Sequence, residues 1–231
     1  MIAIENMSSK HKAIDLPNLP SHETMDKGIP DSQLYELESY KNVYLSNCQI
    51  EGTKGVDFQY AYFDNVKAIN TYFKKLTLQD VRITKSDFAN TEWEEASLNR
   101  VEFINCRLLG FKAIKSRLKN VIFKGCQGQL SQFNASKFDN AIFDNCILED
   151  STFIESSLIN VKFVNCQMNN VILTDAKFKN TDFRGSNIEG LQIKISQLQG
   201  AILDVFQAAY ILQRYANVIV KAVDEETMDN A

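Results

Sequence analysis

The chain has 231 residues, of which 45% are hydrophobic, and a net charge of −4 from 25 basic and 29 acidic side chains. This is enough for one folded domain with flanking segments, and no stretch approaches the roughly 18 apolar residues of a membrane-spanning helix. Residues 1–12 lack the apolar core of a signal peptide. We therefore expect a cytoplasmic protein that does not bind membranes and whose five cysteines stay reduced.

The first 42 residues are polar and irregular, and they contain all three prolines and both histidines of the chain. This composition predicts a loosely ordered tail over residues 1–42. Within the tail, Asp31 is a suitable helix N-cap, and Leu34, Leu37 and Tyr40 follow at helical spacing. We therefore expect a short helix over residues 31–40.

Residues 43–203 carry a repeat with a period of five. Counting from Phe58, every fifth residue is large and apolar with few exceptions, and thirteen of the fifteen phenylalanines fall in this series. The residue two positions earlier is small or β-branched, and Asn or Gly is frequent two positions later. Asn and Gly tolerate the left-handed backbone of tight turns. Each pentad is therefore predicted to form one short side with two inward side chains, followed by a corner, and residues 43–203 to form one β-helix.

A second period, of twenty residues, predicts the shape of each coil. Four cysteines and four phenylalanines recur at this interval and are expected to stack in the core: Cys106, Cys126, Cys146, Cys166, Phe103, Phe123, Phe143 and Phe163. Twenty residues are four pentads, which predicts a four-sided parallel coil with neighbouring strands about 4.8 Å apart. A straight column of thiols does not suit tetrahedral zinc, so we interpret the cysteines as core packing and expect no metal or cofactor.

Residues 204–220 break the rhythm and predict a helix that begins at the N-cap Asp204 and ends at Asn217, followed by a short strand over 218–220. Apolar residues cover more than one face of this helix. One face can close the core, and the surplus predicts contact with a second copy of the chain. The expected dimer contacts are Phe206, Ala209, Tyr210, Leu212, Tyr215, Val218 and Val220. The alternative is a cap folded back on a monomer. Residues 221–231 are expected to form an acidic disordered tail.

The repeat resembles that of the pentapeptide-repeat family, and the segment Ala176-Lys177-Phe178-Lys179-Asn180 is close to the family consensus. The resemblance extends from residue 56 to residue 203 without an insertion. It implies a bacterial, all-β protein: a right-handed quadrilateral parallel β-helix, here with a C-terminal α-helix for capping and dimerisation. The best-known activity in the family is protection of DNA gyrase and related type II topoisomerases from quinolones or toxins, by an acidic rod that imitates duplex DNA.

Two features of the sequence depart from DNA mimicry. The outward columns at intervals of twenty are not continuously acidic. Charge lies instead in an acidic band at 87–95, a basic band at 100–124 and an acidic band at 139–155. The loops that interrupt the quinolone-protection proteins are also absent. The basic band is spread round all four sides without aromatic stacking partners, so we expect no binding of nucleic acid.

The repeat region has no histidine that could activate a serine or cysteine, no phosphate-binding loop and no paired metal ligands. We therefore predict a non-catalytic protein-interaction module whose partner the sequence does not identify. A topoisomerase-binding protection factor is the alternative. Outward aliphatic side chains form a candidate partner surface, although strands often carry such residues without a function. These residues are Ile104, Ile122, Ile142 and Val164.

Overall fold

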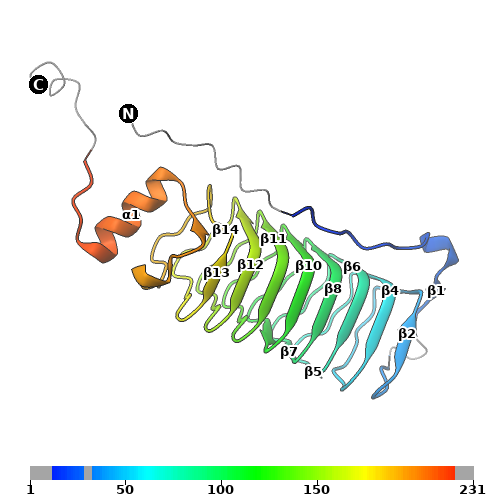
Figure 1. Ribbon diagram of the computed structural model, residues 1–231. Coiled ribbons are helices and arrows are strands. Elements are labelled where there is room, and N and C mark those ends of the chain that lie inside the picture. The colour runs from blue at the N-terminus through cyan, green and yellow to red at the C-terminus, as the bar shows by residue number, and fades with distance from the viewer. Residues whose placement is uncertain (1–11, 29–32, 222–231) are drawn as a thin grey trace, which may run out of the picture.

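A computed structural model describes residues 12–28 and 33–221, and the chain forms a right-handed quadrilateral β-helix of about nine turns with one α-helix at its C-terminal end (Figure 1). Most strands belong to one parallel sheet that runs along the rod. In chain order it contains β1 (Asp26–Lys27), β2 (Ser39–Lys41), β3 (Val43–Ser46), β4 (Asp57–Asp64), β6 (Thr77–Thr84), β8 (Ser97–Ile104), β10 (Arg117–Lys124), β11 (Lys137–Asp144), β12 (Ser157–Val164), β13 (Lys177–Lys179), β14 (Thr181–Asp182) and β15 (Ala201–Ile202).

A second parallel sheet lies on another side of the rod. It contains β5 (Tyr72–Lys74), β7 (Glu92–Glu94) and β9 (Lys112–Ile114). The remaining elements are the 3-10 turns η1 (His22–Thr24) and η3 (Ile195–Gln197) and the helix α1 (Val205–Ala216).

The register of the sheets confirms the period of twenty. Val81 pairs with Val101, and Val101 pairs with Val121, so residues twenty apart lie one above the other. The same interval joins the other sides, as in the bridges Asp87–Arg107 and Gln132–Thr152. Each coil therefore exchanges backbone hydrogen bonds with the coil before it and the coil after it.

The corners depend on residues with a left-handed backbone. Asn fills more of these positions than any other residue type, as at Asn65 (φ 53°), Asn105 (φ 52°) and Asn165 (φ 52°). Long strands such as β10 and β11 also turn a corner, at Asn120 (φ 52°) and Asn140 (φ 66°). Asn adopts this conformation more readily than most residues with a side chain. The left-handed corners, many of them Asn, lie at intervals of five residues along much of the rod and bend the chain into four sides.

The phenylalanines that recur at intervals of twenty form one continuous stack in the core. The ring centroids of Phe103 and Phe123 are 4.7 Å apart, those of Phe123 and Phe143 4.6 Å, and those of Phe143 and Phe163 5.0 Å, with interplanar angles of 7–11°. Phe183 continues the stack at 5.1 Å from Phe163. All of these rings are buried. The stack fills the interior with apolar surface that repeats from coil to coil.

The cysteine column lies beside this stack and has a structural role. Each thiol lies within 3.6 Å of two backbone carbonyls, as Cys126 does at the carbonyls of Phe103 and Lys124. Ser186 continues the column and donates to the Phe163 carbonyl at 3.0 Å. Hydrogen bonds with Cys106 and Cys146, together with burial, raise the pKa of the Cys126 thiol. The column cysteines are therefore small donors to backbone carbonyls in the core.

The β-helix begins earlier than residue 43, and the helix expected over residues 31–40 is wrong for the described residues 33–40. A turn with Leu37 at φ 61° is followed by β2, which pairs with β4 at an interval of eighteen residues. Leu34 is buried, and the Tyr40 ring stacks on Phe58 at 5.2 Å. These apolar residues close the end of the core and do not form a helix face. Residues 31 and 32 lie outside the described part.

The C-terminal helix is confirmed, with both of its predicted ends. The Asp204 carboxylate accepts from the Gln207 backbone N–H at 2.9 Å, and Asn217 ends the helix at φ 52°. The strand expected over 218–220 is wrong. The Val218 N–H donates to the Leu212 carbonyl, and the Gln213 amide donates to the Val220 carbonyl, so this segment is tied back to the helix. The tail predicted at 221–231 lies outside the described residues, apart from Lys221.

Replacing Phe143 by alanine should destabilise the protein by about 3–5 kcal/mol, because it opens a cavity between two stacked rings. The measurement is urea unfolding followed by circular dichroism. Leu130→Ala is the control, since this side chain is 55% exposed on the rod, away from α1, and its loss should cost little. Equal effects of the two substitutions would contradict the stacked core.

Candidate interaction surfaces

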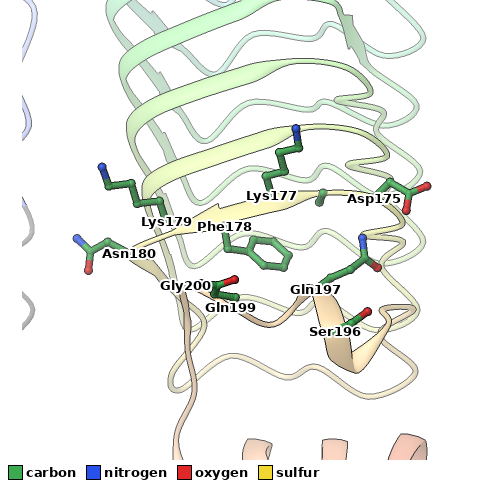
Figure 2. A pocket seen from close by; sticks show the side chains of 10 residues that line it. Asp175, Lys177, Phe178, Lys179, Asn180, Ser196, Gln197, Gln199 and Gly200 are labelled. Atoms are coloured by element: carbon green, nitrogen blue, oxygen red, sulfur yellow. The ribbon is translucent and has the colours of Figure 1, made fainter.

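The described residues contain no cluster of three or more His, Cys, Asp or Glu side chains that could hold a metal ion. None of the helices in this part of the chain combines the length and apolarity that crossing a membrane requires. An open hollow of about 640 Å³ lies where η3 leaves the coil, between β13 and residues 196–200. Figure 2 shows the Phe178 ring pointing into the hollow, whereas Lys177 and Lys179 point away. No acid and base converge in this hollow, which gives it no catalytic arrangement.

The inner face of α1 closes the C-terminal end of the rod. The buried Gln207 amide donates to the carbonyls of Phe183 and Ser186, at 2.7 and 2.8 Å. Ile211 is buried one turn later. The Tyr210 hydroxyl oxygen accepts from the Gly190 N–H at 2.8 Å, and the Tyr215 hydroxyl donates to the Leu191 carbonyl. Tyr210 and Tyr215, predicted as dimer contacts, therefore bind the chain's own last coils.

Most of the other predicted dimer contacts are exposed, either on the outer face of α1 or in the segment that follows it. Phe206 is 86% exposed, and Leu212, Val218 and Val220 are also exposed, whereas Ala209 is half-buried. Val205 adds a strongly exposed apolar side chain to this face, and Ile219 is strongly exposed beyond the end of the helix. The sequence predicted an apolar surplus on the helix, but it did not predict that Gln207 holds the inner face. The only signal was its place three residues after the N-cap.

The predicted aliphatic surface on the rod is not continuous. Ile122 and Ile142 are neighbours in register, but Glu102 and Lys162 flank them. Ile104 and Val164 share the next column. Lys124 and Asp144 lie between these two and form an ion pair at 3.6 Å. The four side chains therefore lie on one side of the rod as separate groups, divided by charges.

The bands of charge seen in the sequence neutralise one another between coils. Glu102 accepts from Arg82 at 2.6 Å, and Asp87 pairs with Arg107 at 3.0 Å. Glu92 likewise lies 3.3 Å from Lys112. Residues twenty apart lie one above the other, so the acidic band at 87–95 and the basic band at 100–124 form ion pairs between neighbouring coils. We call these rows of pairs ladders. The rod therefore presents paired charges in this region, neither an acidic column nor a basic one.

The N-terminal segment runs along the outside of the rod, which the sequence did not predict (Figure 1). The backbone N–H of Asn18 donates to the Asp80 carboxylate at 2.9 Å. The Asn120 amide donates to the Asp15 carboxylate at 3.1 Å, and the Asn140 amide donates to the Ala13 carbonyl at 3.0 Å. Contacts between residues more than sixty positions apart have no periodic signal. Part of the predicted tail is thus bound to the β-helix.

Asp80 is the central charge of this contact. It is fully buried and accepts two hydrogen bonds from Arg100, both at 2.6 Å. Burial raises the pKa of the Asp80 carboxyl, but the hydrogen bonds from Arg100 and Asn18 and the charge of Arg100 outweigh it, so the pKa lies below its ordinary value. The carboxylate is therefore ionised in the folded protein at neutral pH.

A family model described as a pentapeptide repeat region matches residues 96–157 and 129–203. The chain belongs to the pentapeptide-repeat family. Among solved structures, this pentapeptide-repeat protein is similar to HetL, a pentapeptide repeat protein involved in heterocyst differentiation regulation from the cyanobacterium Nostoc sp. strain PCC 7120. The identity is 15% and the TM-score 0.41, over 74% of this chain and 91% of HetL. It is also similar to QnrB1, a plasmid-mediated fluoroquinolone resistance protein, with 18% identity and a TM-score of 0.37, over 84% of this chain and 95% of that chain. No curated protein matches the chain by sequence.

The ion pair of Asp80 predicts a pH dependence of stability. A carboxyl with a lowered folded pKa stabilises the fold above its unfolded pKa of about 3.9, and this contribution is lost as the pH falls through the folded value. The difference in unfolding free energy between the wild type and Asp80→Asn should therefore be constant from pH 5 to 8 and shrink below about pH 4. Urea unfolding at pH 7 and pH 3 measures it. Asp139→Asn, at an exposed carboxylate, is the control. A difference that grows in acid would contradict the assignment.

Proposed function

We propose that this pentapeptide-repeat protein is a non-catalytic interaction rod that pairs with a second copy of itself through the outer face of α1 and offers its sides to a protein partner. The exposed apolar face of α1 carries this proposal. Val205 and Phe206 are 81% and 86% exposed at the start of a helix whose inner face is fixed to the rod by Gln207. A rigid apolar face of this kind is typical of an interface.

A second copy suits this face because a two-fold axis brings the same patch of each protomer together and closes the assembly. The contact joins two rods at their C-terminal ends and leaves all four sides of both rods accessible. Phe206 and Leu212 are the expected centre of the interface. Val218 and Val220 are expected at its edge.

A non-catalytic role agrees with the family and with the site geometry. Four of the five cysteines are buried in the core, and none of the five forms a disulfide. Free cysteines of this kind persist in a reducing compartment, which supports a cytoplasmic location. The body of the rod has no histidine. The hollow next to β13 is open and has no paired acid and base. These features favour recognition by surface over chemistry.

The dimer predicts a specific effect of charge on α1. Phe206→Asp should convert the dimer to a monomer, because two buried charges would face each other across the two-fold axis. Sedimentation equilibrium measures the mass of the particle. Gln167→Glu adds the same charge at an exposed place on the rod and should leave the dimer intact. A wild-type protein that is monomeric at micromolar concentration would refute the dimer.

Topoisomerase protection by DNA mimicry is the less favoured function, because the ladders of ion pairs remove the acidic column that mimicry requires. We expect no protection of purified DNA gyrase from a fluoroquinolone in a supercoiling assay with micromolar protein. Restored supercoiling would instead favour the topoisomerase-binding function. That result would contradict the proposal that the rod binds a different protein partner.

A further inference from the structure

We propose that the corner of the rod at Asp80, Arg100, Asn120 and Asn140 is a binding groove for an extended peptide with an acidic residue near its middle, and that residues 12–20 occupy it as a removable strap. We call these four residues the corner groove and residues 12–20 the strap. The inference names a partner class for the proposed interaction rod, and it rests on that function only in part, since it can fail while the α1 dimer stands.

The burial of the corner groove distinguishes it from the other corners. Asp80, Asn120 and Asn140 are 0%, 2% and 4% exposed, although their backbones turn outward corners of the rod. Asn residues at the next corner of the same coils are exposed, namely Asn105, Asn145 and Asn165. The strap covers this corner, because all of its described hydrogen bonds to the rod are made to the corner groove. The strap therefore acts as a bound ligand of this corner.

The contacts define which groups of a peptide the corner groove recognises. Asn140 donates to a backbone carbonyl, Asn120 donates to a carboxylate two residues later, and Asp80 accepts from a backbone N–H three residues after that. Asn140 also donates to the Asn120 side-chain oxygen at 2.7 Å, which orients both amides. Arg100 lies between Asp80 and Asn120 in the column, where its positive charge is bound to Asp80 and also interacts with the Asp15 carboxylate. An acidic residue near the middle of an extended peptide satisfies this pattern.

The spacing of the contacts requires an extended ligand. The three coils from Asn140 to Asp80 rise by about 14 Å at 4.8 Å per coil. The five residue-to-residue steps from Ala13 to Asn18 cover this rise, which is about 3 Å per step and typical of polyproline II or strand. Pro17 and Pro20 favour this conformation and hold the residues before them extended. The strap thus loses little conformational freedom when it binds.

The strap is held loosely enough to be exchanged. Three direct hydrogen bonds join it to the corner groove, and Lys12, Ala13, Asp15 and Leu16 remain exposed. A hollow of about 190 Å³ lies beside it, bordered by Ala13, Asn140, Ile142 and Lys162 among others. A competing peptide can enter this hollow before the strap leaves. The isolated aliphatic Ile142, predicted as part of a partner surface, would then contact the incoming peptide.

The test uses the full-length protein and a fluorescein-labelled peptide with the sequence of residues 12–20. The double variant Asp15→Arg/Asn18→Pro weakens the strap, because it reverses a charge and removes the N–H that Asp80 accepts. Fluorescence anisotropy should show binding to this variant at least tenfold tighter than to the wild type, whose own strap competes. A peptide with alanine in place of Asp15, and a protein that also carries Asn120→Ala, should each lose at least tenfold in affinity.

Two results would overturn the proposal: no saturable binding to a variant that circular dichroism shows to be folded, or equal binding of both peptides to both proteins. If the double variant does not fold, the wild type gives the answer. A peptide of residues 13–20 in excess should then accelerate tryptic cleavage after Lys12 at least fivefold, since it displaces the strap. An unchanged cleavage rate would refute exchange. Sedimentation of the same samples reports the α1 dimer separately, so the two proposals fail independently.

Discussion

The structure depends on one constraint: the backbone and side chains of each coil must match those of the coils on either side. A parallel strand in this rod has no partner within its own coil, so it pairs with the strands of the neighbouring coils, in register with residues twenty positions away. The interior is narrow, and rings such as Phe123 and Phe143 fill it only when they stack. The same alignment places Glu92 beside Lys112 on the outside. Core, sheet and surface charge thus follow from a single register.

Much of the fold could be predicted because each repeat places the same types of residue at the positions that must match between coils. The thirteen phenylalanines in one register and the Asn residues expected at the corners predicted that each pentad forms one side of a coil. The cysteine column predicted four sides to a coil. The end of the β-helix before Asp204 could also be predicted, because the five-residue period stops there and Asp204 is a helix N-cap. The wrong predictions concern the first turns, where the repeat is irregular. The first turns pair at intervals of seventeen and eighteen, and Leu34 and Tyr40 had no period from which to infer their burial in a coil.

The surfaces were less predictable, since they depend on contacts between distant parts of the chain. Helical periodicity alone does not say which face of α1 contacts the rod. The residue that fixes this face is Gln207, a buried polar side chain among the apolar ones that close the core. The strap is a clearer case. Asp15 and Asn18 belong to an irregular segment, and nothing in their spacing relates them to Asn120 or Asp80. A partner-binding rod therefore has two distinct candidate surfaces, an apolar one at its end and a polar one along a corner.

A double-mutant cycle tests the central claim most directly, because it measures whether two side chains interact. Phe123→Leu and Phe143→Leu, made singly and together, should show a coupling energy of about 0.5–1.5 kcal/mol in urea unfolding, since the two rings stack. The same cycle on Phe103 and Phe183, at opposite ends of the stack, should be additive within about 0.5 kcal/mol. Additive effects at Phe123 and Phe143 would contradict the account, because residues twenty apart would then not be in contact.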